Sequence, residues 1–219
     1  EDLLANSRLR KKALMQQLLT GKKRLPGFAG DSRTLALSEI SDVIVSNVDK
    51  KSFEDEVSVR LCNYTDVYYN NTITSNMNFM QATASGAEIK KFSLKIGDVI
   101  ITKDSETPGD IAVPALVSED LGGVVCGYHL AIIRPDQKKV DSRFLNFLLS
   151  VPKTRYYFFT LATGATRFGL SIGSIQKAQF NLPPLLEQRE ISDILTVADE
   201  EIEALEQRIS NLKLQKKAL

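Results

Sequence analysis

The chain is poor in the residues on which most enzyme sites depend. Its 219 residues include two cysteines, one histidine and no tryptophan. No apolar run approaches the roughly 20 residues that cross a bilayer, and the first residues lack the apolar region of a secretory signal. We therefore expect a cytoplasmic protein without a membrane segment. Cys62 and Cys126 have no C-x-x-C spacing, so we expect two buried apolar side chains rather than a disulfide or zinc ligands.

The single histidine, His129, lies in the apolar stretch "GYHLAII". Any Ser-His-Asp or Cys-His arrangement would have to use this residue, and we interpret it as a buried strand residue whose hydrogen bonds are satisfied. The sequence contains no Walker loop and no G-x-G-x-x-G motif. The string "NLPPL" from residue 181 differs from the Asn-Pro-Pro-Tyr motif of amino-methyltransferases, because a leucine precedes the prolines and no aromatic follows them. The sequence therefore predicts no catalytic residue and no metal site.

Charge is balanced over the chain, whose formal net charge is +1. Basic residues concentrate in residues 1–25 and acidic residues in 185–219, whereas the central part is close to neutral. A domain that held DNA by phosphate neutralisation alone would be more basic. Composition therefore gives no argument for nucleic-acid binding.

Hydrophobic patterns divide the chain into three parts. Residues 1–25 carry leucines at helical spacing and end in a basic turn with proline and glycine. Residues 26–184 alternate short β-type runs, such as "DVIVS" and "DVIIT", with turn residues. Two helices interrupt these runs: Asp141 or Ser142 caps the first, and Pro152 opens the second. We expect an α+β domain with a mixed β-sheet, flanked by long helices.

The third part, residues 185–219, has strictly heptad apolar spacing, which is typical of a coiled-coil helix. A narrow stripe on so long a helix needs a partner helix to bury it; the alternative is packing onto the chain's own body. The predicted stripe consists of Ile191, Leu195, Ala198, Ile202, Leu205, Ile209, Leu212, Lys216 and Leu219.

The two ends of the chain repeat one another. "EDLLANSRLRKKAL" at residues 1–14 matches "EQRISNLKLQKKAL" at 206–219. Self-similarity at one offset indicates a repeated unit. We interpret 1–25 as the end of a helix that leaves a preceding repeat, and 185–219 as the same helix leaving this one.

Three parts of the sequence carry a family resemblance. "LPPLLEQREISDILTVADEEIEALEQRISNLKLQKKAL" at 182–219 resembles the end of a repeat in the specificity subunits of type I restriction-modification systems, where a Leu-Pro-Pro-Leu-x-Glu-Gln-x-x-Ile motif opens a long conserved helix. "LRKKALMQQLLTGKKRL" at 9–25 looks like the end of that helix in the preceding repeat. "IGDVIITKDSE" at 96–106 and "TGATRFGLSIGSIQKAQFNLPP" at 163–184 resemble recurring segments of the family's target-recognition domains.

The resemblance implies a non-catalytic subunit that binds double-stranded DNA. In that family each of two recognition domains reads half of a bipartite target, and two antiparallel conserved helices hold the domains apart and dock the methylating subunits. The resemblance therefore implies that the long helices flanking the domain of this chain form an antiparallel coiled coil. Catalysis belongs to the partner modification and restriction subunits, and the modification subunit binds S-adenosylmethionine, so we expect no cofactor here. With one recognition domain, the chain is expected to be a half-length subunit, which would form a homodimer through its C-terminal helix, or a fragment.

Loops beside glycines are the best candidates for DNA contacts, because glycine lets a backbone approach closely. "TKDSETPGD" at 102–110 and "TGATRFG" at 163–169 meet these terms; "NYTDVYYNNT" at 63–72 is a third candidate, which could instead form strand and turn. Arg167 could bind guanine through two hydrogen bonds, contact a phosphate or be merely solvated. The candidate DNA-binding residues are Tyr64, Asn70, Lys103, Asp104, Ser105, Thr107, Thr166 and Arg167.

A second interpretation is a coiled-coil protein-interaction adaptor that does not bind DNA directly. The two interpretations differ in the surface charge that they predict. A positive face that includes Lys103 and Arg167 favours DNA binding, whereas a neutral or acidic face favours the adaptor.

Overall fold

A computed structural model gives the fold and describes residues 1–218, so Leu219 of the predicted stripe lies outside the described residues. The chain forms two compact units. One is Arg33–Leu182, which lies within the range 26–184 predicted for the recognition domain; the other combines Glu1–Ser32 with Pro183–Leu219. Within the described residues, no helix is both long and apolar enough to span a membrane.

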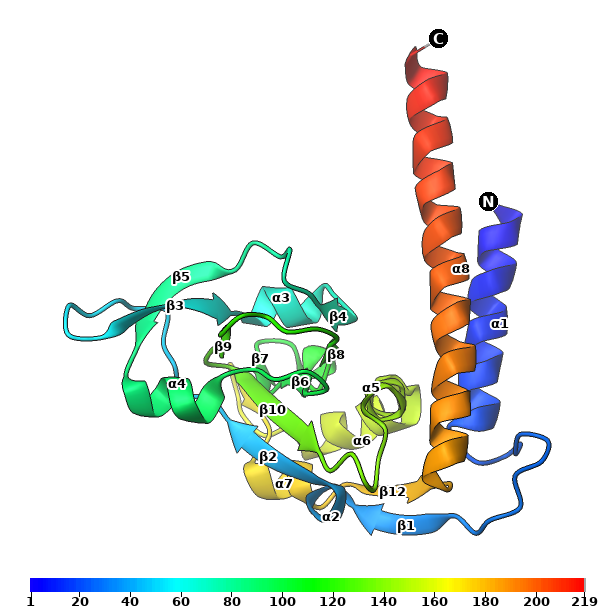
Figure 1. The fold of residues 1–219 in the computed structure, drawn as a ribbon, viewed down its shortest axis with the longest axis horizontal. Helices are drawn as coiled ribbons and strands as arrows, with labels where there is room; N and C mark the ends of the chain where they lie inside the picture. Colours follow the sequence, from blue (N-terminus) through cyan, green and yellow to red (C-terminus); the bar gives the residue numbers. More distant parts are fainter. Residues whose placement is uncertain (219) are drawn as a thin grey trace. The chain divides into compact units, whose positions relative to one another are not determined.

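The larger unit contains a five-stranded sheet formed by β2 (Ser41–Val45), β10 (Leu130–Pro135), β6 (Val99–Thr102), β8 (Pro114–Val117) and β4 (Thr72–Ile73), in that spatial order (Figure 1). β10 is antiparallel to β2 and β6, and β6 is antiparallel to β8, whereas β4 and β8 are parallel. All four side chains of β6 are buried, as expected for a strand covered on both faces. The predicted mixed sheet is confirmed.

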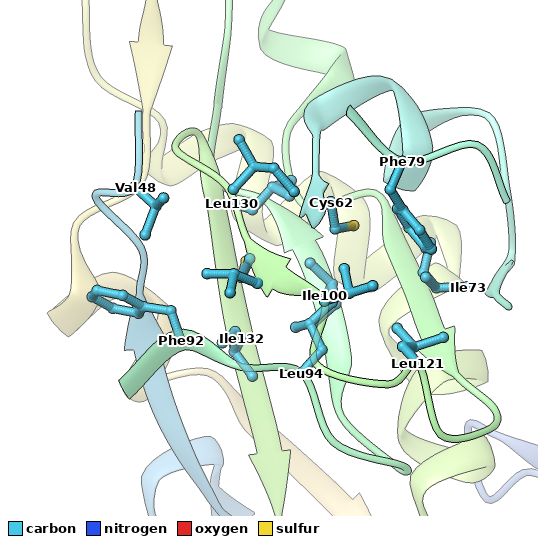
Figure 2. Packing of buried hydrophobic residues seen from close by; sticks show 14 of the residues in the cluster. Val48, Cys62, Ile73, Phe79, Phe92, Leu94, Ile100, Leu121, Leu130 and Ile132 are labelled. Carbon is cyan, nitrogen blue, oxygen red and sulfur yellow. The ribbon is translucent and has the colours of Figure 1, made fainter. Parts of the chain in front are cut away.

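A three-stranded sheet adds to this core, with β3 (Val57–Cys62) between β5 (Met80–Ala84) and β9 (Val125–Cys126). Figure 2 shows Ile100 and Leu130 of the first sheet among the core side chains that include Cys62 and Phe92. Cys62 and Cys126 are paired in the register of β3 and β9, and both are free and fully buried. Burial raises the pKa of the Cys126 thiol. The prediction of two buried apolar cysteines is confirmed.

The remaining strands form two short antiparallel pairs, β1 (Arg33–Ala36) with β12 (Gln179–Leu182) and β7 (Asp104–Ser105) with β11 (Phe168–Gly169). The Asp141 side chain caps α5 (Ser142–Ser150) by accepting from the Phe144 N–H at 3.0 Å, and Pro152 opens α6 (Pro152–Leu161), both as predicted. The shorter helices are α2 (Leu37–Ile40), α3 (Tyr64–Tyr68), α4 (Gly86–Phe92), the 3-10 turn η1 (Pro108–Asp110) and α7 (Ile172–Gln176).

The smaller unit is an antiparallel pair of helices, α1 (Asp2–Leu18) and α8 (Leu185–Ala218) (Figure 1). Ion pairs set the direction of the pair: Glu1 contacts Lys213, Arg8 contacts Glu206, and Lys11 contacts Asp199. Two of these pairs join a cation of α1 to an acid of α8, and the third joins the acid Glu1 to the cation Lys213.

The partner that the heptad stripe requires is thus α1 of the same chain. Burial decreases along the stripe: Ile191, Leu195 and Ala198 are buried, Ile202, Leu205 and Ile209 are half-buried, and Leu212 is 55% exposed. Over its last turns α8 exposes both Leu212 and Leu214.

Candidate functional site

A pocket with a volume of about 380 Å³ opens in the larger unit. Four separate segments line it: α3, the stretch from β7 to η1, the residue before β10, and the loop before β11. The lining residues are Tyr64, Thr65, Tyr68, Tyr69, Asp104, Ser105, Glu106, Thr107, Asp110, His129 and Arg167.

Backbone pairing brings these segments together around Lys103. Its N–H donates to the carbonyl oxygen of His129 at 2.8 Å, and its own carbonyl oxygen accepts from the Leu170 N–H at 3.0 Å. The next two residues then pair with β11, Asp104 opposite Gly169 and Ser105 opposite Phe168. The position of the pocket is therefore fixed by the strand ladder rather than by side chains alone.

The loop that carries Arg167 is closed at its base and tightly turned. Thr163 and Gly169 exchange two backbone hydrogen bonds, of 3.1 and 2.9 Å. Gly164 has a φ of +144°, and a Cβ there would lie 1.9 Å from the carbonyl oxygen of Arg167. Only glycine fits this turn without moving the backbone that presents Arg167.

The α3 wall presents two tyrosine hydroxyls. Tyr64 donates to the Ser105 hydroxyl at 3.2 Å, and Tyr68 donates to Oδ1 of Asp110 at 3.0 Å. Their rings stack with centroids 5.5 Å apart. Burial raises the pKa of Tyr64, and the hydrogen bond to the Asp110 carboxylate raises the pKa of Tyr68, so both remain neutral phenols at physiological pH.

A chain of hydrogen bonds runs across the other side of the pocket. The carboxylate of Asp104, which is almost fully buried, contacts Nζ of Lys103 at 2.8 Å through Oδ2 and Nδ1 of His129 through Oδ1. Nη1 of Arg167 then lies 3.1 Å from Nε2 of His129, and its Nη2 lies 3.4 Å from Oε1 of Glu106.

The interpretation of His129 as a buried strand residue is wrong. This residue precedes β10 rather than lying within a strand, its backbone has a left-handed φ of +75°, and its ring lines the pocket. Burial lowers the pKa of the imidazole, and the charges of Arg167 and Lys103 act in the same direction against the opposing effect of Asp104. The ring is therefore neutral at neutral pH.

The pocket brings together five of the eight residues predicted to bind DNA, namely Tyr64, Asp104, Ser105, Thr107 and Arg167. Lys103 borders it but is partly buried and paired with Asp104. Thr166 is exposed beside Arg167, and Asn70 donates to the Asp66 carbonyl oxygen at 2.9 Å at the end of α3. Which of these residues contact DNA stays a prediction.

Tyr68 also lines the pocket and belongs to the candidate stretch 63–72, whereas sequence reasoning missed the remaining lining residues, Thr65, Tyr69, Glu106, Asp110 and His129. All except His129 lie in stretches already selected by their turn chemistry, so their local signal was present. The stretch 63–72 proved to contain the helix α3 where strand and turn were the alternative; the Asp66 carboxylate caps it by accepting from the Asn63 N–H at 2.7 Å.

The electrostatics of the lining differ from the positive face expected for DNA binding. Three acids, Asp104, Glu106 and Asp110, line the pocket together with one cation, Arg167. By the charge criterion alone this lining does not favour DNA. It does offer hydroxyls, carboxylates and a guanidinium, the groups that hydrogen-bond base edges. Within residues 1–218, no group of three or more His, Cys, Asp or Glu residues is placed to hold a metal ion.

Comparison with known proteins identifies the family. Residues 32–214 match the model of the type I restriction modification DNA specificity domain. The chain is 24% identical over 186 residues to a Methanocaldococcus jannaschii protein named as a type I restriction enzyme MjaX specificity subunit, covering 84% of this chain and 43% of that protein. It is 31% identical over 107 residues to the StySPI specificity subunit of Salmonella potsdam, covering 48% of this chain and 23% of that protein.

Solved structures share the fold. The HsdS subunit from Thermoanaerobacter tengcongensis has a TM-score of 0.63 at 17% identity, over 94% of this chain and 46% of that one. A chain from a study of type I R-M system assembly and conformational transition has a TM-score of 0.66 at 19% identity, over 99% of this chain and 51% of that one. The chain spans about half or less of the length of each of these relatives. By its family match, the chain belongs to the type I restriction-modification DNA specificity domains.

Proposed function

We propose that the chain is a DNA target-recognition module of a type I restriction-modification complex and reads one half of a bipartite target. The family match over residues 32–214 carries this proposal. The pocket around Arg167 is the reading site, because it gathers five predicted contact residues from three segments on one surface. Base edges are read by such donors and acceptors, whereas phosphate contacts position a protein without specifying sequence.

The chain itself is non-catalytic in this proposal. A modification subunit binds S-adenosylmethionine and methylates adenine, a restriction subunit cleaves DNA, and both depend on this chain for the choice of sequence. The helices α1 and α8 dock the modification subunit. Partner subunits also supply phosphate contacts, which accounts for a reading surface that is not itself basic.

If the chain is a half-length subunit, two copies pair through α8. The support is the repeat: residues 206–219 resemble residues 1–14, and α1 packs antiparallel on α8. The end of α8 therefore carries the kind of surface that binds another α8, and its Leu212 and Leu214 are exposed. A pair of chains would present two recognition domains, one for each half of a bipartite target.

The proposal is tested by mapping N6-methyladenine in a host that expresses the modification subunit with and without this chain. We expect methylation at one sequence motif only when the chain is present. Replacing residues 33–182 with the recognition domain of another specificity subunit should change half of that motif. Methylation of the same motif without the chain, or no change after the replacement, would contradict the proposal.

A further inference from the structure

We propose that Asp104 and His129 are positioning residues that hold the guanidinium of Arg167 for contact with guanine, and that they do so only while His129 is neutral. This inference rests on the proposed function, because it assigns a base to the same site. It adds a specific tautomer, a pH dependence and a base preference.

The geometry determines which ring nitrogen carries the proton. The Asp104 carboxylate accepts hydrogen bonds, so the Nδ1 that contacts it must be the N–H of the imidazole. Nη1 of Arg167 lies 3.1 Å from Nε2 and 3.5 Å from Nδ1, so the guanidinium, which has only donors, faces the ring and favours a neutral imidazole whose Nε2 carries no proton. His129 is thus the neutral Nδ1–H tautomer. Lys103 contacts the second oxygen of Asp104 and so restrains the orientation of the carboxylate.

The backbone of His129 gives independent support. Left-handed φ values are uncommon outside glycine and cost energy unless the surroundings enforce them. Here the His129 carbonyl oxygen is held by the Lys103 N–H at 2.8 Å, and the Tyr128 ring packs against the imidazole with centroids 4.0 Å apart. The fold therefore maintains an unfavourable conformation that points this ring between Asp104 and Arg167.

Arg167 itself is suited to read a base. Its side chain is 51% exposed. Nη1 contacts His129, which is held in place, whereas Nη2 contacts Glu106, whose side chain is 80% exposed and therefore anchors it weakly. A free arginine loses much rotamer freedom on binding, and anchoring one end removes part of that cost in advance. Guanine is the base that an arginine fork contacts with two hydrogen bonds, through O6 and N7.

Protonation of His129 would break this arrangement. A proton on Nε2 replaces the lone pair by an N–H and places two cations in contact. The charged or titratable groups that face the ring or line its pocket are Lys103, Asp104, Arg167, Tyr64, Tyr68, Tyr69, Glu106, Asp110 and Tyr128. Among them only the carboxylates favour the charged ring, and burial together with the two neighbouring cations keeps its pKa low.

The first test needs no DNA. His129 is the only histidine in the chain, so nitrogen NMR of the imidazole is unambiguous. We expect Nδ1–H at neutral pH and titration below the usual histidine pKa, with Asp104→Asn losing the preference for Nδ1–H. An Nε2–H tautomer, or an unchanged tautomer in Asp104→Asn, would overturn the positioning role whatever the chain does with DNA.

The second test measures DNA affinity of the chain assembled with its modification subunit between about pH 7.5 and pH 5.5, the range in which a histidine titrates. If protonation of His129 only added a positive charge, acidification would strengthen DNA binding. We instead expect the DNA affinity to fall by about fivefold, which is the lower end of what one base contact contributes. His129→Gln keeps a neutral acceptor and should remove this pH dependence, as should Arg167→Ala. Lys138→Ala, at the opposite end of β10, should keep it.

Duplexes with 7-deazaguanine identify the base. This analogue lacks the N7 acceptor, so at one position it should weaken binding by the wild type and leave Arg167→Ala unaffected. Tighter binding at low pH, pH dependence that persists in His129→Gln, or equal loss with 7-deazaguanine in both proteins would overturn the inference. Methylation that does not depend on the chain would instead refute the proposed function, even if the NMR result holds.

Discussion

Arg24 binds the carboxylate of Glu187 through two nitrogens of its guanidinium, Nε and Nη2. Nε lies 2.8 Å from Oε1 and Nη2 lies 2.5 Å from Oε2, while the Leu25 N–H donates to Oε1 at 3.2 Å. The Glu187 side chain is fully buried, whereas Arg24 is 32% exposed. This ion pair joins the segment after α1 to the first turn of α8 and so stabilises the helical unit at its closed end.

Arg24→Ala should therefore destabilise the helical unit strongly. Removing Arg24 leaves the buried Glu187 carboxylate without a counter-charge, which lowers the free energy of unfolding. Arg8→Ala is the matched control, because Arg8 pairs with Glu206 on the surface and such pairs contribute about 0–1 kcal/mol. Urea unfolding monitored by helical circular dichroism measures both; equal effects of the two substitutions would contradict the structural difference.

Acid should weaken the same contact. Burial alone would raise the pKa of Glu187, but the hydrogen bonds from Arg24 and Leu25 and the charge of Arg24 outweigh it and hold the pKa below the usual value of 4.5. Because the folded pKa is depressed, the stabilisation is present above the unfolded pKa and is lost as pH falls through the folded one. The free energy of unfolding should thus fall more steeply below pH 4.5 in the wild type than in Glu187→Gln. Parallel pH curves for the two proteins would show that Glu187 is not responsible.

Gly164→Ala should impair DNA recognition without unfolding the domain. A Cβ would collide with the Arg167 carbonyl oxygen at 1.9 Å, so the loop must move and Arg167 with it. We expect a loss of affinity close to that of Arg167→Ala, with an unchanged thermal midpoint for the core. Gly86→Ala is the control, since a Cβ there meets nothing within 4 Å. Native affinity of Gly164→Ala would show that the loop geometry does not matter.

Pairing of two chains through α8 should depend on the exposed leucines near its end. Leu212→Glu with Leu214→Glu should convert an oligomer to a monomer, because each substitution places a charge in the apolar surface that would bind the second α8. Val197→Glu, at an exposed position off the stripe, should leave the assembly intact. Sedimentation velocity measures the state, and a monomeric wild-type chain would rule out the pairing.

The fold could be predicted from sequence where patterns are local and long enough. β2, β3, β6 and β12 follow from apolar β-type runs, and the starts of α5 and α6 follow from Asp141 and Pro152. The short helices α2, α3 and α7 could not be predicted, because about one turn of helix carries no periodicity. The antiparallel pairing of α1 with α8 was expected from the family resemblance, and the opposite charges of the two end segments are a second signal for it in the sequence.

The candidate site could be predicted only in part. The loops of Asp104 and Arg167 were found through glycines and polar residues, but their pairing through β7 and β11 is a long-range contact without a local pattern. His129 was assigned to the strand because an apolar run follows it directly at Leu130. Its left-handed backbone, which turns the ring into the pocket, is determined by tertiary contacts.

In the proposed function Arg167 reads a base for an assembled methylating complex. The most direct measurement is the affinity of that complex for its mapped target and for every single-base substitution of it, with wild type, Arg167→Ala and Arg167→Lys. We expect Arg167→Ala to lose about 1–3 kcal/mol and its preference at one G·C pair, and Arg167→Lys to recover charge without that preference. Unchanged affinity and unchanged preference at every position in Arg167→Ala would contradict the account.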